Sequence, residues 1–167
     1  MNKEIQKLLV STKTADVEKG LELFEKTGSV KELPLVCDLL DQEDAVLFEA
    51  KIIETLSNIK VTEANVVIID AILKSQAEQG NLRAFMQICW QSPLNFTQYL
   101  DLFTDIFLES DYLTAIEAFT VIENIWIDHT YEEEHRELLL DKIKDQLGRL
   151  DETKVVLAKE LIMVLEN

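Results

Sequence analysis

The amino-acid sequence predicts an all-α protein. Apolar residues recur at i, i+3, i+4 and i+7 in nearly every stretch between polar breaks, and sustained period-two alternation is almost absent. Glycine (4) and proline (2), the residues that interrupt helices, are scarce among the 167 residues. Because the breaks between apolar stretches are short, we expect a series of helices in which each helix runs antiparallel to the next.

The periodicity predicts ten helices, and local signals support their ends. Short polar side chains that can cap a first turn stand at five expected starts: Thr14, Thr62, Asn95, Asp111 and Asp151. Glycines that could close a last turn in a left-handed conformation stand near three expected ends: Gly28, Gly80 and Gly148. The predicted helices span residues 2–11, 14–26, 30–41, 44–58, 63–79, 81–91, 95–109, 111–127, 131–147 and 152–166.

Ten antiparallel helices with short connections suit either a compact bundle or a stacked array, and we expect a single domain over residues 1–167. A small residue stands near the middle of the second helix of each predicted pair. These candidate stacking residues are Gly20, Ala50, Ala84, Ala118 and Ala158. Their spacing of 30, 34, 34 and 40 residues favours the array, because small residues at such places let successive hairpins approach closely.

Residues 32–58, ELPLVCDLLDQEDAVLFEAKIIETLSN, make the array more specific. The first predicted helix of this stretch carries Leu33, Pro34, Val36, Leu39 and Leu40, the turn Asp41 and Asp44, and the second helix Val46, Ala50 and Leu56. This pattern resembles a HEAT repeat, a member of the armadillo-like α-solenoids, although Leu47 takes the place of the family's arginine. The resemblance implies a short right-handed α-α superhelix of about five helical hairpins, the second helices lining a concave face. Most HEAT arrays bind proteins or peptides, and a few are enzymes.

Composition narrows the classes of partner. The net charge of −16 argues against nucleic acid and anionic membrane surfaces and permits a basic protein partner. The opening residues 1–20 carry frequent charges, which is not typical of a signal peptide or membrane anchor, and we expect a cytoplasmic monomer. The two cysteines, Cys37 and Cys89, stand among apolar residues and are expected to be reduced thiols in the core.

Charge and aromatic content are distributed unevenly along the chain. Residues 84–135 contain no lysine or arginine, ten acidic residues and ten of the twelve aromatic residues. Aromatic anchors with an acidic border suit a basic or amphipathic segment of another protein. The candidate protein-binding residues are Tyr99, Asp105, Asp111, Tyr112, Glu117, Trp126 and Tyr131.

An alternative reading of the same segment is structural. Phe96, Leu100, Phe103 and Phe107 recur at helical spacing and are expected to form core, and the acidic residues can form a solvated face. Tyrosine and tryptophan fit this alternative less well, because their amphipathic rings suit partly exposed sites.

The residues offer little support for metal or catalytic chemistry. His129 and Glu133, and Glu132 and His135, have helical spacing, but a di-iron bundle needs a second Glu-x-x-His copy and a zinc site a further ligand. We therefore predict no metal, no cofactor and no catalytic residue.

The sequence favours a non-catalytic protein-binding or scaffold module. One alternative is an inhibitor or immunity protein that neutralises a basic toxin. Another is a HEAT-type enzyme, which would require a concave pocket with a perturbed carboxylate or a bound metal.

Overall fold

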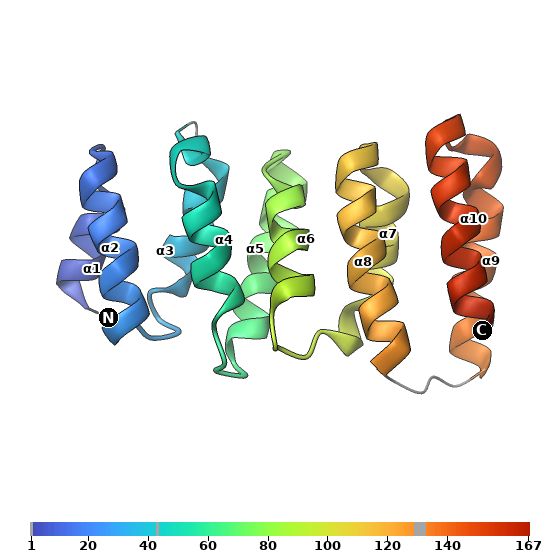
Figure 1. Ribbon diagram of the computed structural model, residues 1–167, viewed down its shortest axis with the longest axis horizontal. Helices are drawn as coiled ribbons and strands as arrows, with labels where there is room; N and C mark the ends of the chain where they lie inside the picture. Colours follow the sequence, from blue (N-terminus) through green and yellow to red (C-terminus); the bar gives the residue numbers. More distant parts are fainter. Residues whose placement is uncertain (1, 43, 129–132) are drawn as a thin grey trace. The chain divides into compact units, whose positions relative to one another are not determined.

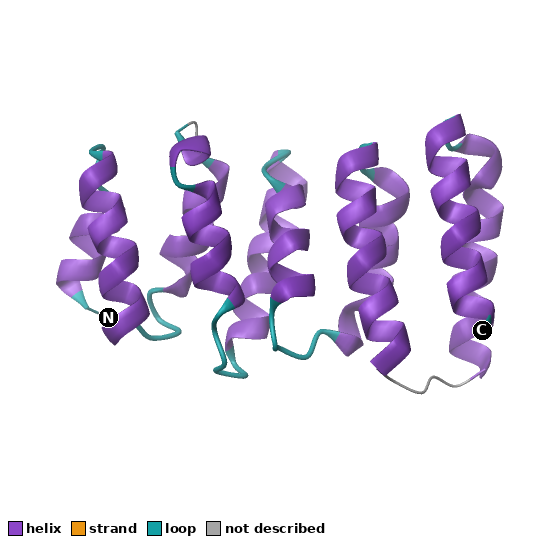
Figure 2. Cartoon of the chain, viewed as in Figure 1, coloured by secondary structure: helices purple, strands orange, loops and turns teal. Residues whose placement is uncertain are grey.

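A computed structural model describes residues 2–42, 44–128 and 133–167. These residues form helices and connecting turns without any β-strand, so the prediction of an all-α protein is confirmed (Figure 2). By internal packing the chain divides into an N-terminal unit, Met1–Asn95, and a C-terminal unit, Phe96–Asn167. The prediction of one domain over the whole chain stays a prediction.

The described residues of the N-terminal unit form six α-helices and two 3₁₀ turns. Figure 1 labels the α-helices. The α-helices are α1 (Lys3–Leu9), α2 (Thr14–Thr27), α3 (Leu33–Asp38), α4 (Glu49–Ser57), α5 (Ala64–Glu78) and α6 (Leu82–Gln91). The 3₁₀ turns η1 (Leu39–Asp41) and η2 (Ala45–Leu47) lie between α3 and α4.

The described residues of the C-terminal unit form four α-helices, three of which are longer than ten residues, and two 3₁₀ turns. The α-helices are α7 (Leu100–Glu109), α8 (Tyr112–Asp128), α9 (Glu133–Gln146) and α10 (Glu152–Glu166). The turn η3 (Thr97–Tyr99) leads into α7, and η4 (Leu147–Arg149) follows α9. Each of the ten predicted ranges therefore overlaps one of these α-helices.

Within each unit the helices form hairpins whose members pack on their counterparts in the next hairpin. In the N-terminal unit α1 packs on α3 and α3 on α5, while α2 packs on α4 and α4 on α6. In the C-terminal unit α7 packs on α9, and α8 packs on α10. First helices thus contact first helices and second helices contact second helices, as in stacked helical hairpins.

The start of α4 differs from the sequence prediction. The chain makes the 3₁₀ turn η2 first, and Phe48 then adopts φ −138°, so α4 begins at Glu49 instead of residue 44. In a 3₁₀ turn residues three apart share a side, and the buried side chains here are Ala45 and Phe48. Val46 is consequently 80% exposed, although the HEAT-like pattern places it in the second helix.

The predicted left-handed glycine caps are also wrong, because none of Gly28, Gly80 and Gly148 has a positive φ. The left-handed residue that closes α5 is Gln79, with φ 57°, and Gly80 has no positive φ. Gly80 is needed for another reason: a Cβ there would overlap Oδ1 of Asp41 and lie 2.5 Å from Oγ of Ser75. That Asp41 oxygen accepts hydrogen bonds from Ser75 Oγ (3.0 Å) and from the main-chain N–H of Asn81 (2.7 Å). Asp41 therefore joins η1 to the α5–α6 turn.

The cores consist of aliphatic and aromatic side chains, as the helical spacing predicts. Phe96, Leu100, Phe103 and Phe107 are all at most 3% exposed, which confirms that they are core residues. The rings of Phe96 and Phe103 meet edge to face with centroids 6.2 Å apart. This arrangement is a favourable one for aromatic pairs.

Candidate functional site

The structure places the predicted protein-binding residues on η3, α7 and α8 of the C-terminal unit. Tyr112, at the start of α8, is 42% exposed, whereas Tyr99 and Trp126 are half-buried. Glu117 is half-buried within α8. Tyr131 lies outside the described residues.

Asp105 and Asp111 both make structural contacts. Asp105 in α7 forms an ion pair of 2.6 Å with the ammonium group of Lys142 in α9. Asp111 caps α8 by accepting hydrogen bonds from the main-chain N–H groups of Leu113 (2.9 Å) and Thr114 (3.1 Å) and from the Thr114 hydroxyl (2.9 Å). Partial burial alone would raise the pKa of Asp111, but these hydrogen bonds outweigh it and lower the pKa. Both carboxylates thus stabilise the C-terminal unit, and contact with a partner stays a prediction for them.

The exposed apolar residues of α8 include two that the sequence did not single out. Leu113 is 52% exposed and Ile127 is 71% exposed. They are about four helical turns apart, so they project from the same side of α8. Their aliphatic side chains gave no signal in the sequence, because the periodicity assigns most such residues to the core.

The C-terminal unit is strongly acidic. Residues 96–167 contain 17 acidic and 6 basic residues, a formal net charge of −11, compared with −5 for residues 1–95. Four of the six basic side chains bind groups of the same unit: Arg136 pairs with Glu133, Lys142 with Asp105 and Lys144 with Glu166, and Lys154 binds main-chain carbonyls. The positive charge of this unit is therefore largely engaged internally.

The candidate stacking residues fall into two groups. Gly20, Ala84, Ala118 and Ala158 are buried, as close packing requires. Gly20 brings α2 against α1 of its own hairpin, since a Cβ there would lie 2.9 Å from Cδ2 of Leu9. Ala50 is exposed, so the prediction that it lies at a close helix contact is wrong; the turn η2 rotates α4 and turns Ile52 and Ile53 inward. For the four buried residues, a role in the stacking of successive hairpins stays a prediction.

The cysteines and the histidine-rich stretch carry no assembled reactive site in the described part of the chain. Cys37 and Cys89 are free and buried, as predicted, and burial raises the pKa of the Cys37 thiol to about 12. His129 and Glu132 lie outside the described residues. Among the residues that the structure describes, no group of three or more histidine, cysteine and carboxylate side chains could hold a metal ion.

The N-terminal unit contains a cavity that the sequence did not reveal. This α2–α4 cavity has a volume of about 390 Å³ and lies at the C-terminal ends of α2 and α4. Its apolar lining includes Phe24, Leu33, Ile59, Val61 and Ala64. Its polar lining includes Glu25, Lys51, Glu54, Thr55, Asn58 and Lys60. The volume lies within the range of about 300–1,000 Å³ that is common for small-molecule sites.

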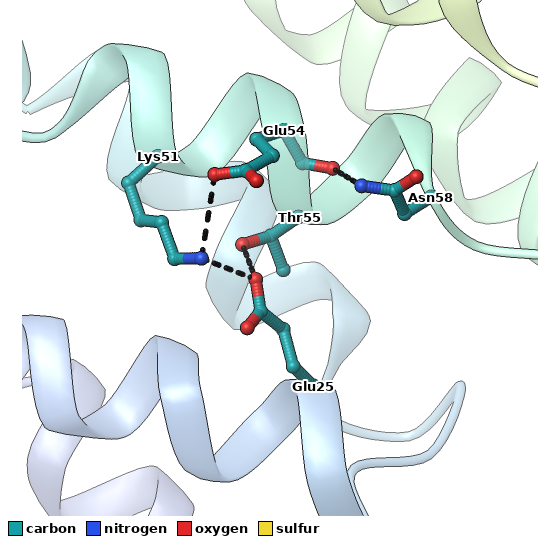
Figure 3. Close-up of polar contacts among 5 residues, drawn as sticks. All are labelled: Glu25, Lys51, Glu54, Thr55 and Asn58. Carbon is teal, nitrogen blue, oxygen red and sulfur yellow. Dashed lines mark hydrogen bonds and ion pairs between the residues drawn. The ribbon is translucent and has the colours of Figure 1, made fainter.

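Figure 3 shows polar side chains that line the α2–α4 cavity: Glu25, Lys51, Glu54, Thr55 and Asn58. Lys51 Nζ lies 2.7 Å from Glu25 Oε1 and 3.4 Å from Glu54 Oε2. Thr55 donates its hydroxyl proton to the same Glu25 oxygen at 2.8 Å, and Asn58 Nδ2 donates to the main-chain carbonyl of Glu54 at 2.9 Å. The hydrogen bond from Lys51 is the main reason that the pKa of Glu25 is lowered, and the reciprocal contact raises the pKa of Lys51. The pair is ionised at neutral pH.

Neither a membrane-spanning helix in the described part of the chain nor a similar known protein points to a function for these surfaces and this cavity. No helix in the described ranges combines the length and apolar character needed to cross a membrane. Comparison with models of protein families, with curated proteins and with solved structures found no match.

Proposed function

We propose that this protein is a non-catalytic protein-binding or scaffold module that captures a basic or amphipathic segment of another protein. The capturing surface is the exposed part of α7 and α8 in the C-terminal unit. The protein acts as a monomer in the cytoplasm, without a cofactor or metal, and its hairpins continue as a HEAT-like solenoid. The packing of first helices on first helices and second helices on second helices within each unit supports the solenoid part of the proposal.

The charge of the C-terminal unit is the observation that carries the proposal. A net charge of −11 on residues 96–167, with four of six basic side chains engaged internally, produces a negative potential around this unit. Such a potential accelerates the approach of a basic segment and disfavours acidic ones.

Exposed apolar side chains supply what charge alone does not. Tyr112, Leu113 and Ile127 on α8 offer aromatic and aliphatic area that an amphipathic helix could cover with its apolar face. Exposed carboxylates stand at both ends of the α7–α8 hairpin: Asp101 and Glu109 in α7, and Asp128 at the end of α8. A partner with basic residues beside an apolar stripe matches both features.

Binding of two designed peptides tests the proposal. One is an amphipathic helical peptide of lysine and leucine, and the other is a glutamate–leucine peptide of the same length and pattern. We expect saturable binding of the lysine peptide alone, with an affinity that falls about tenfold or more as salt is raised, because the steering field is screened. Fluorescence anisotropy measures both affinities.

Charge reversal then locates the surface. The triple variant Asp101→Lys, Glu109→Lys and Asp128→Lys should abolish capture while leaving the capping contact of Asp111 and the Asp105–Lys142 pair intact. The matched control reverses three exposed acidic residues of the N-terminal unit, Glu18, Glu22 and Asp70, and changes the net charge equally. Equal binding of both peptides, or equal loss in both triple variants, would contradict the proposal.

A further inference from the structure

The α2–α4 cavity offers hydrogen-bond acceptors and apolar surface in the same place. Glu25 and Lys51 are each about one-third exposed, at 35% and 32%, so their contacts are partly shielded from bulk water. The cavity is also lined by Phe24, Leu33 and Ala64, which are buried core residues. A ligand here would meet a polar wall and an apolar wall together.

The hydrogen-bonding capacity of the polar wall is unbalanced. Both contacts to Glu25 use Oε1, and within the described residues its Oε2 has no hydrogen-bond partner. The amide of Asn58 uses its nitrogen as a donor to Glu54, and the Thr55 hydroxyl uses its proton on Glu25. Asn58 therefore keeps one further N–H and the Thr55 hydroxyl keeps no donor, whereas each carboxylate can accept several hydrogen bonds at its two oxygens.

Lysine side chains do not reverse this imbalance. The ammonium group of Lys51 has three donors, and two of them are directed at Glu25 and Glu54. Lys60 also lines the cavity, as an exposed residue of the α4–α5 connection that makes no ion pair with Glu25 or Glu54. Glu25, Glu54 and the Asn58 oxygen remain as the acceptors of the polar wall (Figure 3).

We propose that the α2–α4 cavity binds an organic cation, an ammonium or guanidinium group on an apolar stem. The cationic group donates to Glu25 Oε2, to Glu54 and to the Asn58 side-chain oxygen. The stem lies against the lining formed by Phe24, Leu33, Ile59, Val61 and Ala64. A cation also benefits from each carboxylate, because hydrogen bonds between charged partners are stronger than neutral ones. The site is in the N-terminal unit and is independent of the α7–α8 surface.

Three small probes of nearly equal shape test which sign of ligand charge the α2–α4 cavity prefers. Phenethylamine carries the cation, 2-phenylethanol is neutral and phenylacetate is an anion. Two-dimensional NMR titration of the uniformly ¹⁵N-labelled full chain should show saturable shifts at Gly28, Lys51 and Asn58 with phenethylamine only. Equal shifts with 2-phenylethanol or with phenylacetate, or no saturable shift with the amine, would overturn the proposal.

Paired variants separate the cavity from general charge effects. Glu25→Gln should weaken phenethylamine binding about tenfold, the loss expected for a hydrogen bond between charged groups. Glu22→Gln changes an exposed acidic residue one turn earlier on the same helix and should leave affinity unchanged. Lys51→Met removes the internal competitor for both carboxylates and should strengthen binding, whereas Lys19→Met, at an exposed position of α2, should not.

The same titration distinguishes two sources of the cation. N-acetyl-arginine amide and N-acetyl-lysine amide present the chemistry as a peptide side chain would, while phenethylamine presents it as a free amine. Binding of the blocked amino acids at least as tightly as the free amine identifies a protein segment as the source, and the reverse identifies a small molecule. Unchanged circular dichroism and melting temperature of Glu25→Gln show that a loss of binding is not a loss of fold. Wild-type affinity in a folded Glu25→Gln variant would overturn the proposal.

Discussion

The ammonium group of Lys154, in the first turns of α10, donates a hydrogen bond of 2.7 Å to the main-chain carbonyl oxygen of Leu108 near the end of α7. A second hydrogen bond of 2.7 Å goes to the carbonyl oxygen of Ser110. Lys154 is only 4% exposed, so its charge is buried together with the carbonyls that it binds. The last carbonyl groups of a helix lack hydrogen-bond donors within the helix. At the end of α7, Lys154 of the next hairpin provides these donors.

Lys154→Met should destabilise the protein by about 3 kcal/mol, because it leaves buried carbonyl oxygens without their charged donor. Lys159→Met, at an exposed position of the same helix, should change the free energy of unfolding by no more than about 0.5 kcal/mol. Urea denaturation followed by circular dichroism measures both values. Equal stability of the two variants would show that the Lys154 hydrogen bonds contribute nothing.

Gly80→Ala should destabilise the protein by about 1–3 kcal/mol, because the added methyl group overlaps Asp41 Oδ1 and crowds Ser75 Oγ. Gly148→Ala is the matched substitution, since no atom lies within 4 Å of the position of its Cβ. That variant should gain about 0.4–1 kcal/mol by restricting the unfolded chain. Thermal melts of the two variants should therefore shift in opposite directions.

The buried carboxylate of Glu32 should make the folded protein less stable in acid. This carboxylate accepts hydrogen bonds from the hydroxyl and N–H of Ser29 and from the N–H of Asn2, and these bonds lower its pKa from 4.5 to about 2. Because the pKa is lower in the folded state, the contribution of Glu32 is complete above pH 4.5 and is lost as the pH falls to about 2. The Glu32→Gln variant should be less stable than the wild type at neutral pH. Between pH 4.5 and 2 its stability should also change less with pH than that of the wild type.

Melting temperatures across this pH range measure the effect. Glu18→Gln, at an exposed position of α2, serves as the control and should keep the pH dependence of the wild type. A Glu32→Gln variant with the wild-type slope between pH 4.5 and 2 would show that other carboxylates govern acid unfolding.

Removal of the hydroxyl group from two buried serines, Ser57 and Ser75, should change stability in different ways. Ser57 Oγ is buried without a hydrogen-bond partner among the described residues, so Ser57→Ala should leave stability unchanged or raise it. Ser75 Oγ donates to Asp41, so Ser75→Ala should destabilise the protein by about 1–2 kcal/mol. A calorimetric comparison decides the point, and a destabilised Ser57→Ala variant would reveal an unrecognised partner for that hydroxyl.

The positions of the helices could be predicted from the sequence, because apolar residues recur at the period of a helix within each segment. The capping roles of Asp111 and Asp151 were also predictable, since each side chain binds main-chain groups two or three residues ahead. The start of α4 was not, because the buried Phe48 and the 3₁₀ turn before it decide which side of the helix faces inward. Val46 and Ala50 then lie on the exposed side, against the pattern that the HEAT resemblance implies.

The candidate sites were predictable only in part. A charge imbalance can be counted along a chain, but the pairing of Asp105 with Lys142 joins residues on different helices. The α2–α4 cavity depends on α2, α4 and two connections that meet only after folding, so no short sequence pattern identifies it. The exposure of Leu113 and Ile127 likewise follows from which neighbours α8 has, and these are set by tertiary packing.

The single carboxylate oxygen of Asp41 that binds both Ser75 and Asn81 makes the second and third hairpins interdependent. Asn81 extends the connection, because its amide donates to Glu49 at 2.6 Å in α4 while its oxygen caps α6. Repeat arrays often tolerate the loss or exchange of one hairpin, since each contacts only its neighbours. Here a replacement hairpin would have to reproduce these polar partners as well as an apolar face. Exchange of one hairpin within residues 33–91 should therefore cost more stability than the loss of apolar packing alone.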